Sequence, residues 1–455
     1  MRALPFPIVG ALPPNHPIHA HKGVTVRLSR RTTAVAVVGA AAFALVATGC
    51  SSAGTAPAAN DDWKNEKITL KVATFNDFGY SDEFLAGFTK KYPNIKVEHT
   101  IAATSNDART NYFTKLGAGS GLADVEAVEV DWLPEIMSFS DKLTDLTSDD
   151  TKDRWISWKS QAATDADGRL IGYGTDIGPE AICYRSDLFK EAGLPTDRAE
   201  VAKLLEGDWQ HYFDVGNDFV GKSDAAWFDS AGATYQGMVN QITNAYEKND
   251  GTIVATDNAE VKDIYNQVLT ASSTLSAHLG QWSDDWNAGI GGGKFATMLC
   301  PGWMQGVISG NAPDVKGWDI ADVFPNGGGN WGGSYLTVPA QGAHPEAAKA
   351  LADWLTAPEQ QIKAFVAAGT FPSQTAAYDN PDLTGFTNAY FNNAPVGQIF
   401  ADRAKAVNPT PPFKGPNYFK VSDAMSTALT RVDVDKTDDA ASSWEKFVTD
   451  VKAIG

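Results

Sequence analysis

Segments with the periodicity of strands and helices alternate early in the chain, and this alternation constrains the fold most strongly. Apolar residues recur at every second position over 68–75 and again over 95–99, as expected of β-strands. Between them Ser81 can cap a helix. A further helix is predicted over 106–116 and a further strand over 124–130. This order predicts a parallel sheet flanked by helices, with ligand sites at the carboxyl ends of its strands.

Charge is distributed unevenly along the 455 residues of the chain. The first 49 residues contain five Lys or Arg and no acid, whereas the remainder contains 32 basic and 55 acidic residues. Such an acidic body is a poor partner for nucleic-acid phosphates and anionic membrane faces. A body of about 400 residues also exceeds what one hydrophobic core usually supports. We therefore expect two lobes and no binding of nucleic acid.

The basic leader is typical of exported bacterial proteins. Three arginines over 27–31 precede an uncharged run over 32–48, and small residues then lead to Cys50. This pattern predicts a signal peptide over 1–49 with a lipoprotein-type cleavage site; a simple transmembrane anchor is the alternative. Lipid on Cys50 would hold the protein at the outer face of the cell membrane through a flexible tether over 50–66.

Residues 1–23 do not resemble the start of a signal peptide, because they contain five Pro and three His. We interpret them as lying upstream of the true start codon, near Val24 or Val26. The twin Arg30-Arg31 is followed by a poor match to a twin-arginine export signal.

Cys183 and Cys300 are the cysteines that remain once Cys50 is lipidated. An oxidising compartment favours a disulfide between them, and two buried free thiols are the alternative. Neither cysteine has a His or another Cys at a spacing suited to zinc. We therefore predict no metal and no cofactor.

The segments that most resemble catalytic motifs are incomplete. Residues 289–294 resemble a phosphate-binding loop, but Ala288 stands at the place of its first glycine and Phe295 replaces its Ser or Thr. Four histidines follow the leader, and none has the neighbours of a catalytic triad. We expect a binding protein and not an enzyme.

Thirteen tryptophans exceed what packing alone requires, and ten of them fall into two groups. The first group lies on amphipathic helical segments and is expected in the core: Trp155, Trp158, Trp209, Trp354 and Trp444. The second group stands beside acids, amides or glycines at strand ends or in loops: Trp132, Trp227, Trp286, Trp303 and Trp331. A sugar ring stacks on an aromatic plane while its hydroxyls bond carboxylates and amides. The second group therefore predicts a carbohydrate cleft.

Several segments resemble the sugar-binding lipoproteins of ABC importers, in order along the whole body of the chain. They are GLADVEAVEVD (121–131), EAICYRSDLF (180–189), CPGW (300–303), WGGSY (331–335, continuing to Pro339), LTAPEQ (355–360) and FPS (371–373), after the lipobox Cys50. Within this family the segments 127–130, 227–229 and 300–304 are most similar to cellobiose- and cello-oligosaccharide-binding proteins of actinomycetes.

The resemblance implies a two-lobed α/β fold of the type II periplasmic-binding-protein class, in which each lobe is a sheet flanked by helices and a multi-strand hinge joins them. By the family's pattern the first lobe would contain 67–178 and 335–385. The second lobe would contain 179–334 and 386–455.

The resemblance also implies site residues. Asp131 and Trp132 match a sugar-binding position after a first-lobe strand, and Glu180 matches a hinge acid that contacts ligand. The remaining matches are the binding loop Asn76 to Phe78, the aromatic positions Trp227 (followed by Asp229), Trp303 and Tyr418, and the hinge segment Trp331, Gly332 and Gly333. Trp286 is added from its neighbours alone.

The implied function is extracellular capture of an oligosaccharide, with a β-linked gluco-oligosaccharide favoured. A monomeric protein would close on the sugar and present it to the permease of an ABC transporter, without making or breaking a bond. A secreted glycoside hydrolase and a surface adhesin for insoluble polysaccharide are the alternatives.

Overall fold

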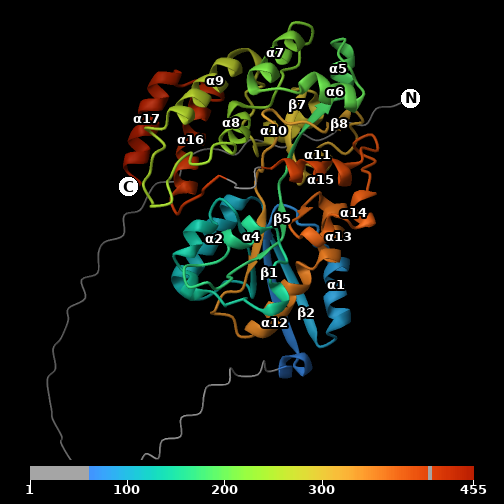
Figure 1. Cartoon of the computed structure of the whole chain (residues 1–455), viewed down its shortest axis with the longest axis vertical. Helices are drawn as coiled ribbons and strands as arrows, with labels where there is room; N and C mark the ends of the chain where they lie inside the picture. The colour runs from blue at the N-terminus through green and yellow to red at the C-terminus, as the bar shows by residue number, and fades with distance from the viewer. Residues whose placement is uncertain (1–60, 408–411) are drawn as a thin grey trace, which may run out of the picture. The chain divides into compact units, whose positions relative to one another are not determined.

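A computed structural model describes residues 61–407 and 412–455 of the chain (Figure 1). The predicted signal peptide, Cys50 and most of the predicted tether lie outside these residues. Within the described ranges, no helix combines the length and the apolar character needed to cross a membrane. The predicted α/β class is confirmed, because sheets flanked by helices make up the described part of the chain.

The first sheet has five strands in the order β2-β1-β3-β9-β4. Strand β1 (Ile68–Phe75) pairs in parallel with β2 (Ile95–Ala102) and with β3 (Val125–Glu129). Strand β9 (Ser334–Thr337) runs antiparallel to both β3 and β4 (Tyr173–Gly174). The sheet is therefore mixed, whereas the alternation of segments predicted a purely parallel one. The difference arises because β9 belongs to a much later part of the chain.

Helices pack against this sheet around one apolar core that includes Leu70, Val128 and Tyr335. The side chain of Ser81 caps the first helix by accepting a hydrogen bond from the Phe84 N–H, as predicted. We call this sheet and its helices the first lobe. The helices are α1 (Asp82–Lys91), α2 (Ser105–Ala118), α3 (Leu133–Met137), α4 (Ser157–Ala162) and α12 (Pro345–Leu355), with short 3-10 turns at Asp61–Asn65, Ser140–Lys142 and Asp149–Thr151.

The second sheet has three antiparallel strands in the order β7-β6-β8 and separates two apolar cores. Its strands are β6 (Glu180–Arg185), β7 (Thr297–Pro301) and β8 (Trp318–Ala321). Ile182 of β6 faces one core and Ala181 faces the other, because successive side chains of a strand point to opposite faces. We call this sheet and its helices the second lobe.

Two sets of helices cover the second sheet. The first core is enclosed by α5 (Ser186–Glu191), α6 (Arg198–Leu205), α7 (Trp209–Val220), α8 (Ala231–Val239), α9 (Ala259–Leu275), α16 (Tyr418–Asp433) and α17 (Ala440–Lys452). The other core is enclosed by α10 (Asp284–Gly292), α11 (Met304–Asn311), α13 (Pro358–Ala368), α14 (Pro381–Thr384) and α15 (Val396–Ala406), beside a 3-10 turn at Thr375–Ala377. Figure 1 shows α7, α9 and α17 far from β1 and β2.

A disulfide joins Cys183 of β6 to Cys300 of β7, with the two Cα atoms 5.4 Å apart. The alternative of two free thiols therefore does not describe this structure. The bond crosses neighbouring strands that are 117 residues apart in the sequence, so it fixes a long-range pairing.

Chain segments that link the two lobes lie side by side. The Thr175 N–H donates to the Ser334 carbonyl at 2.9 Å, and the Trp331 N–H donates to the Gly178 carbonyl at 2.8 Å. A Cβ on Gly178 would lie 1.7 Å from the Trp331 carbonyl oxygen, so only glycine permits this approach. A third segment, β10 (Phe371–Pro372), pairs with β5 (Asp176–Ile177). The connection is thus a hydrogen-bonded bundle of strands.

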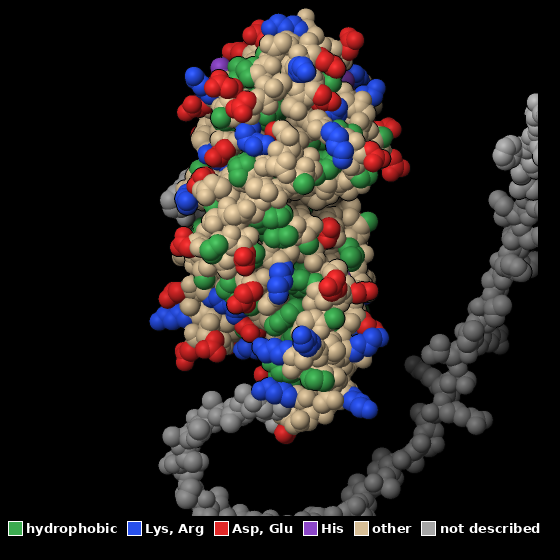
Figure 2. Space-filling model, turned by 90° about the vertical axis from the view of Figure 1, so that its right-hand side faces the viewer, with side chains coloured by type: hydrophobic (Ala, Val, Ile, Leu, Met, Phe, Trp, Pro, Cys, Tyr) green, Lys and Arg blue, Asp and Glu red, His purple; other side chains and the backbone are tan. Residues whose placement is uncertain are grey.

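The surface carries charges of both signs. On the face shown in Figure 2, Asp and Glu side chains of the described residues are interspersed with Lys and Arg, and no extended basic area is visible there.

Candidate ligand-binding cleft

A cleft with a volume of about 510 Å³ is lined by residues of both lobes and of the linking segments. The first lobe contributes the carboxyl ends of β1 and β3 and the start of α2. The second lobe contributes α8, α11, α16 and the loop before α10. The volume lies in the range of small-molecule sites. The cleft occupies the edge of the first sheet at which strand-following residues were predicted to gather.

One wall of the cleft is aromatic. The Trp303 indole N–H donates to the Trp331 carbonyl at 2.9 Å, and the two rings meet nearly edge-on with centroids 5.7 Å apart. Trp282 lies nearly parallel to Trp303, with 6.1 Å between centroids and 23° between planes. The three indoles therefore form one continuous apolar surface with differently oriented faces.

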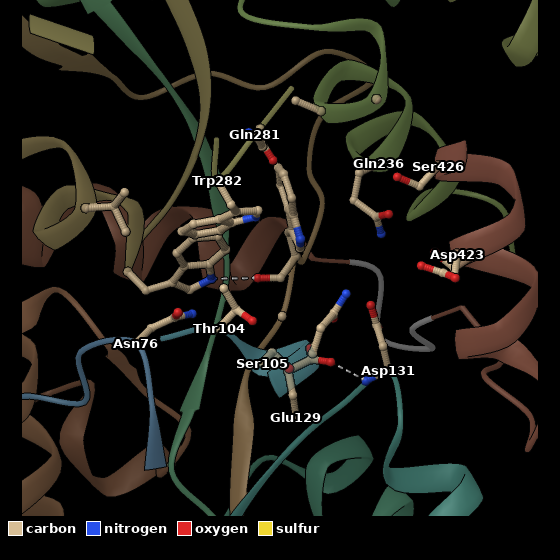
Figure 3. A pocket seen from close by; sticks show the side chains of 18 of the residues that line it. Asn76, Thr104, Ser105, Glu129, Asp131, Gln236, Gln281, Trp282, Asp423 and Ser426 are labelled. Carbon is tan, nitrogen blue, oxygen red and sulfur yellow. Dashed lines mark hydrogen bonds between the residues drawn. The ribbon is translucent and has the colours of Figure 1, made fainter. Parts of the chain in front are cut away.

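The opposite side is polar (Figure 3). Gln236 of α8 lies near Asp423 and Ser426 of α16, while Glu129 and Asp131 approach from the end of β3. The backbone N–H of Asp131 donates to Glu129 Oε2 at 2.8 Å. Carboxylates and amides in this arrangement can accept and donate hydrogen bonds to several ligand hydroxyls at once.

The described residues that line the cleft include no Lys, Arg or His, but they include six acids: Asp77, Glu129, Asp131, Asp176, Asp423 and Asp433. Lys414 does not line the cleft, but its ammonium group donates a hydrogen bond to Asp131 Oδ1. An acidic lining favours ligands that donate hydrogen bonds and disfavours anionic ligands.

Buried charges lie beneath the polar wall. Burial, reinforced by the neighbouring Asp131, raises the pKa of Glu129 well above its ordinary value, and Lys414 opposes this shift. Burial lowers the pKa of Lys159 to about 7, and Asp176 and Glu129 oppose this lowering. The Lys159 ammonium nitrogen has no hydrogen-bond partner among the described residues and lies 3.9 Å from the centre of the Tyr335 ring. Burial therefore disfavours the charged forms of both Glu129 and Lys159 at the base of the cleft.

Half of the predicted ligand-binding residues line this cleft. They come from the loop after β1, the end of β3, the residue before α11 and the segment that leads into β9: Asn76, Phe78, Asp131, Trp303, Trp331 and Gly333. Residues that are distant in the sequence are thus brought to one site.

Four predicted aromatic contacts are instead buried in the lobes and do not line the cleft: Trp132, Trp227, Trp286 and Tyr418. Trp132 donates its indole N–H to Ser105 Oγ at 3.0 Å. Trp227 stacks against Phe189 with centroids 5.6 Å apart. Neighbouring acids or amides pointed to the three tryptophans and the family resemblance pointed to Tyr418, but all four rings pack in the cores.

Two predicted acids are also absent from the lining. Asp229 is 1% exposed, and its Oδ2 accepts hydrogen bonds from Trp286 Nε1 at 2.8 Å and from Gln281 Nε2 at 2.9 Å. Glu180 is completely buried, and its carboxylate oxygens have no hydrogen-bond partner among the described residues. Burial raises the pKa of Glu180 well above its ordinary value. Asp229 is therefore held by neighbouring side chains, whereas Glu180 is buried without a partner among the described residues.

Sequence reasoning missed several lining residues, chiefly Gln236, Gln281, Trp282, Phe419, Asp423 and Ser426. Trp282 follows Gly280 and Gln281 in a loop, so it carried the same signal as the tryptophans that were chosen. The α16 residues recur at helical spacing, but their orientation toward the cleft depends on tertiary packing.

No group of three or more His, Cys, Asp or Glu side chains in the described ranges is arranged to hold a metal ion.

Residues 83–390 match the profile of a family described as bacterial extracellular solute-binding protein. The match covers more than half of the chain, so the protein belongs to this family, whose members are binding proteins and not enzymes. A solved structure described as an extracellular solute-binding protein family 1 member is 47% identical, covers 85% of this chain and 99% of its own, and gives a TM-score of 0.75.

Other relatives are more distant. An arabinooligosaccharide-binding protein of Bacillus subtilis (strain 168) is 24% identical over 406 residues, which cover 85% of this chain and 90% of that protein. A binding protein from B. animalis subsp. lactis Bl-04, solved with β-1,6-galactobiose, is 22% identical; the match covers 86% of this chain and 97% of that one, with a TM-score of 0.72. The maltose-bound MalE3 of T. maritima is 17% identical over 85% of this chain and 100% of its own, with a TM-score of 0.68. The fold is therefore that of type II periplasmic-binding proteins, as predicted.

Proposed function

We propose that the protein captures an uncharged oligosaccharide outside the cell and delivers it to the permease of an ABC transporter. The observation that carries this proposal is a wall of three indoles facing a wall of acids and amides within one cleft. An aromatic plane binds the C–H face of a sugar, and carboxylates accept hydrogen bonds from its hydroxyl groups. The acidic lining argues against uronic acids and sugar phosphates as ligands.

The printed descriptions of the relatives support the sugar class. They include proteins that bind arabinooligosaccharides, β-1,6-galactobiose and maltose. Within this class we favour cellobiose and cello-oligosaccharides, on the resemblance of segments 127–130, 227–229 and 300–304 to proteins that bind them.

Each retained residue has a role in this proposal. Trp303 and Trp331 offer faces or edges to sugar rings, and Asp131 and Asn76 bond hydroxyls. Gly333 lets the backbone of the linking segment approach the ligand. The ligand stabilises a closed arrangement of the lobes only through its different contacts with the open and closed forms.

The proposal includes the organisation of the chain. The predicted lobes are 67–178 with 335–385, and 179–334 with 386–455. Because α13 and α14 pack in a core of the second sheet, we assign 358–385 to the second lobe. Cys50 carries the lipid anchor after removal of the signal peptide, and the protein acts as a monomer at the outer face of the membrane.

Calorimetric titration of the purified full chain tests the proposal. The panel contains cellobiose, cellotriose, maltose, β-1,6-galactobiose and an arabinotriose, with cellobiouronic acid as an anionic control. We expect saturable binding of at least one neutral sugar, recovered intact by chromatography after hours, and much weaker binding of the acid. Absence of binding at millimolar concentration of every soluble sugar would overturn the proposal, and release of shorter sugars would favour a hydrolase.

A further inference from the structure

The loop between α9 and α10 has an unusual backbone. His278 has a φ of 58° and Trp282 a φ of 72°. Positive φ angles are uncommon for non-glycine residues and strained for bulky ones, and they persist only where surrounding contacts impose them. Two such residues within one short loop require a specific explanation.

Two buried carboxylates outside the loop hold it in this shape. Asp229 binds Gln281 through its side chain, and its backbone carbonyl accepts from the Leu279 N–H at 3.0 Å. Asp433 Oδ1 lies 2.8 Å from His278 Nδ1, and its Oδ2 accepts from Ser276 Oγ at 3.1 Å. Asp433 of α16 therefore fixes the first part of the loop, and Asp229, just before α8, fixes the last part.

The fixed loop exposes an indole to the cleft. Among the thirteen tryptophans, all of which lie in the described ranges, Trp282 alone is more than a third exposed, at 41%. Exposing a large apolar side chain costs hydrophobic free energy, and the loop adds backbone strain. A ligand that covers the ring removes the cost of exposure.

The position of Trp282 indicates what would cover it. Its ring is nearly parallel to Trp303 and offset from it, with centroids 6.1 Å apart. Such a separation is comparable to the distance between neighbouring rings of a glycan, and too wide for one pyranose to cover both indoles. The other neighbour of Trp282 is Trp286, whose N–H is bound by Asp229.

We infer that Trp282 stacks on a second sugar ring beyond the one held at Trp303 and Trp331, and that Asp229 and Trp286 are positioning residues for it. This inference rests on the proposed function and deepens it, because it makes the ligand at least a disaccharide. Trp282 then determines the preference for two rings over one.

The test compares disaccharides with their monosaccharides. Cellobiose and maltose are titrated against glucose, and β-1,6-galactobiose against galactose, with the wild-type full chain and with Trp282→Ala. The affinity of wild type for at least one disaccharide should be tenfold or more higher than its affinity for the corresponding monosaccharide. Trp282→Ala should reduce this ratio about tenfold, while its melting temperature stays close to that of wild type because the side chain is exposed. An unchanged ratio would overturn the inference.

A spectroscopic readout separates stacking from a structural role. Saturating disaccharide should protect wild-type fluorescence from acrylamide, and Trp282→Phe should show a smaller protection, which comes from Trp303 and Trp331 alone. Trp354→Phe, which changes a half-buried indole of α12 outside the cleft, is the matched control and should retain the full protection. Trp286→Phe keeps the ring but removes its hydrogen bond to Asp229, and it should lower the disaccharide-to-monosaccharide ratio. If no sugar binds to wild type, the proposed function itself fails. If sugars bind and Trp282→Phe is protected from acrylamide as fully as wild type, only this inference fails.

Discussion

Lys414 donates a hydrogen bond to Oδ1 of Asp131, so an ion pair joins the segment before α16 to the end of β3. The two side chains are only 11% and 17% exposed. Beside them the Arg109 guanidinium lies 4.2 Å from the centre of the Phe419 ring, and Lys420 Nζ lies 3.6 Å from Glu135. These contacts connect the first lobe to α16 along one rim of the cleft.

Breaking the Lys414 ion pair should favour separation of the lobes. We expect Lys414→Met to shift the opening equilibrium by about 1 kcal/mol, the size of a partly exposed pair. Small-angle scattering of the unliganded chain should then show a larger radius of gyration. Raising the salt concentration should increase the radius of gyration of wild type more than that of the variant, which retains only the Lys420–Glu135 pair.

Lys405→Met is the matched control for this measurement, because Lys405 is 67% exposed and pairs with Asp402 on its own helix. An equal radius for wild type and Lys414→Met at low salt would contradict the role of the ion pair.

Gly333 should be intolerant of a side chain. Its φ is 105°, and a Cβ there would lie 2.8 Å from the Asp176 carbonyl oxygen and 3.0 Å from Lys159 Nζ. We expect Gly333→Ala to lower the free energy of unfolding in urea by about 3 kcal/mol, since steric conflict adds to backbone strain. Gly193→Ala should lose only about 1 kcal/mol, because Gly193 has a φ of 72° but nothing within 4 Å of the added Cβ. Equal losses of unfolding free energy in the two variants would show that the segment around Gly333 shifts to make room for the added Cβ.

Lys159 should make stability depend on pH above neutrality. Burial lowers its pKa from 10.5 to about 7, so between these pH values the unfolded chain retains a proton that the folded chain has lost. Stability rises with pH wherever the unfolded state binds more protons. The contribution of Lys159 to the unfolding free energy therefore rises by up to a few kcal/mol from about pH 7 to pH 10.5 and is flat below that window.

Replacement of the lysine isolates this contribution. Lys159→Met should lose the rise in urea titrations across the alkaline window, whereas Lys190→Met, on the surface of α5, should keep it. Parallel curves for wild type and Lys159→Met would mean that the ammonium group stays charged in the folded state.

The disulfide should stabilise the chain without shaping the cleft directly. Replacing both Cys183 and Cys300 by Ala should lower the free energy of unfolding by about 2 to 4 kcal/mol, as for a bond that closes a long loop. Dithiothreitol should lower the melting temperature of wild type and leave that of the double variant unchanged. Sugar affinity should be similar in both, because neither cysteine lines the cleft.

Local pattern was sufficient for elements that depend on short-range periodicity. The strand predicted over 68–75 has those bounds in the structure, and the Ser81 cap begins α1 as expected. The antiparallel pairing of β9 with β3 was missed, because strand direction depends on where the chain returns and not on local alternation.

The candidate site shows a similar limit. Trp227 and Asp229 are close in sequence, as a stacking ring and a sugar-binding acid would be, yet Trp227 packs on Phe189 and Asp229 binds the indole of Trp286. Composition near a tryptophan indicates that polar partners are available, but not whether a sugar or another indole uses them. Trp282 carried the same sequence signal as the tryptophans that were chosen, but its place in the cleft becomes apparent only from its packing against Trp303.

Strand β9 lies between β3 and β4 inside the first sheet, although it is synthesised after every strand of the second sheet. The first sheet cannot be completed until the residues of β9, which begin at Ser334, have been synthesised. Such non-local pairing slows folding. The order of the strands therefore predicts that the first sheet is completed late in folding, after all strands of the second sheet have been synthesised.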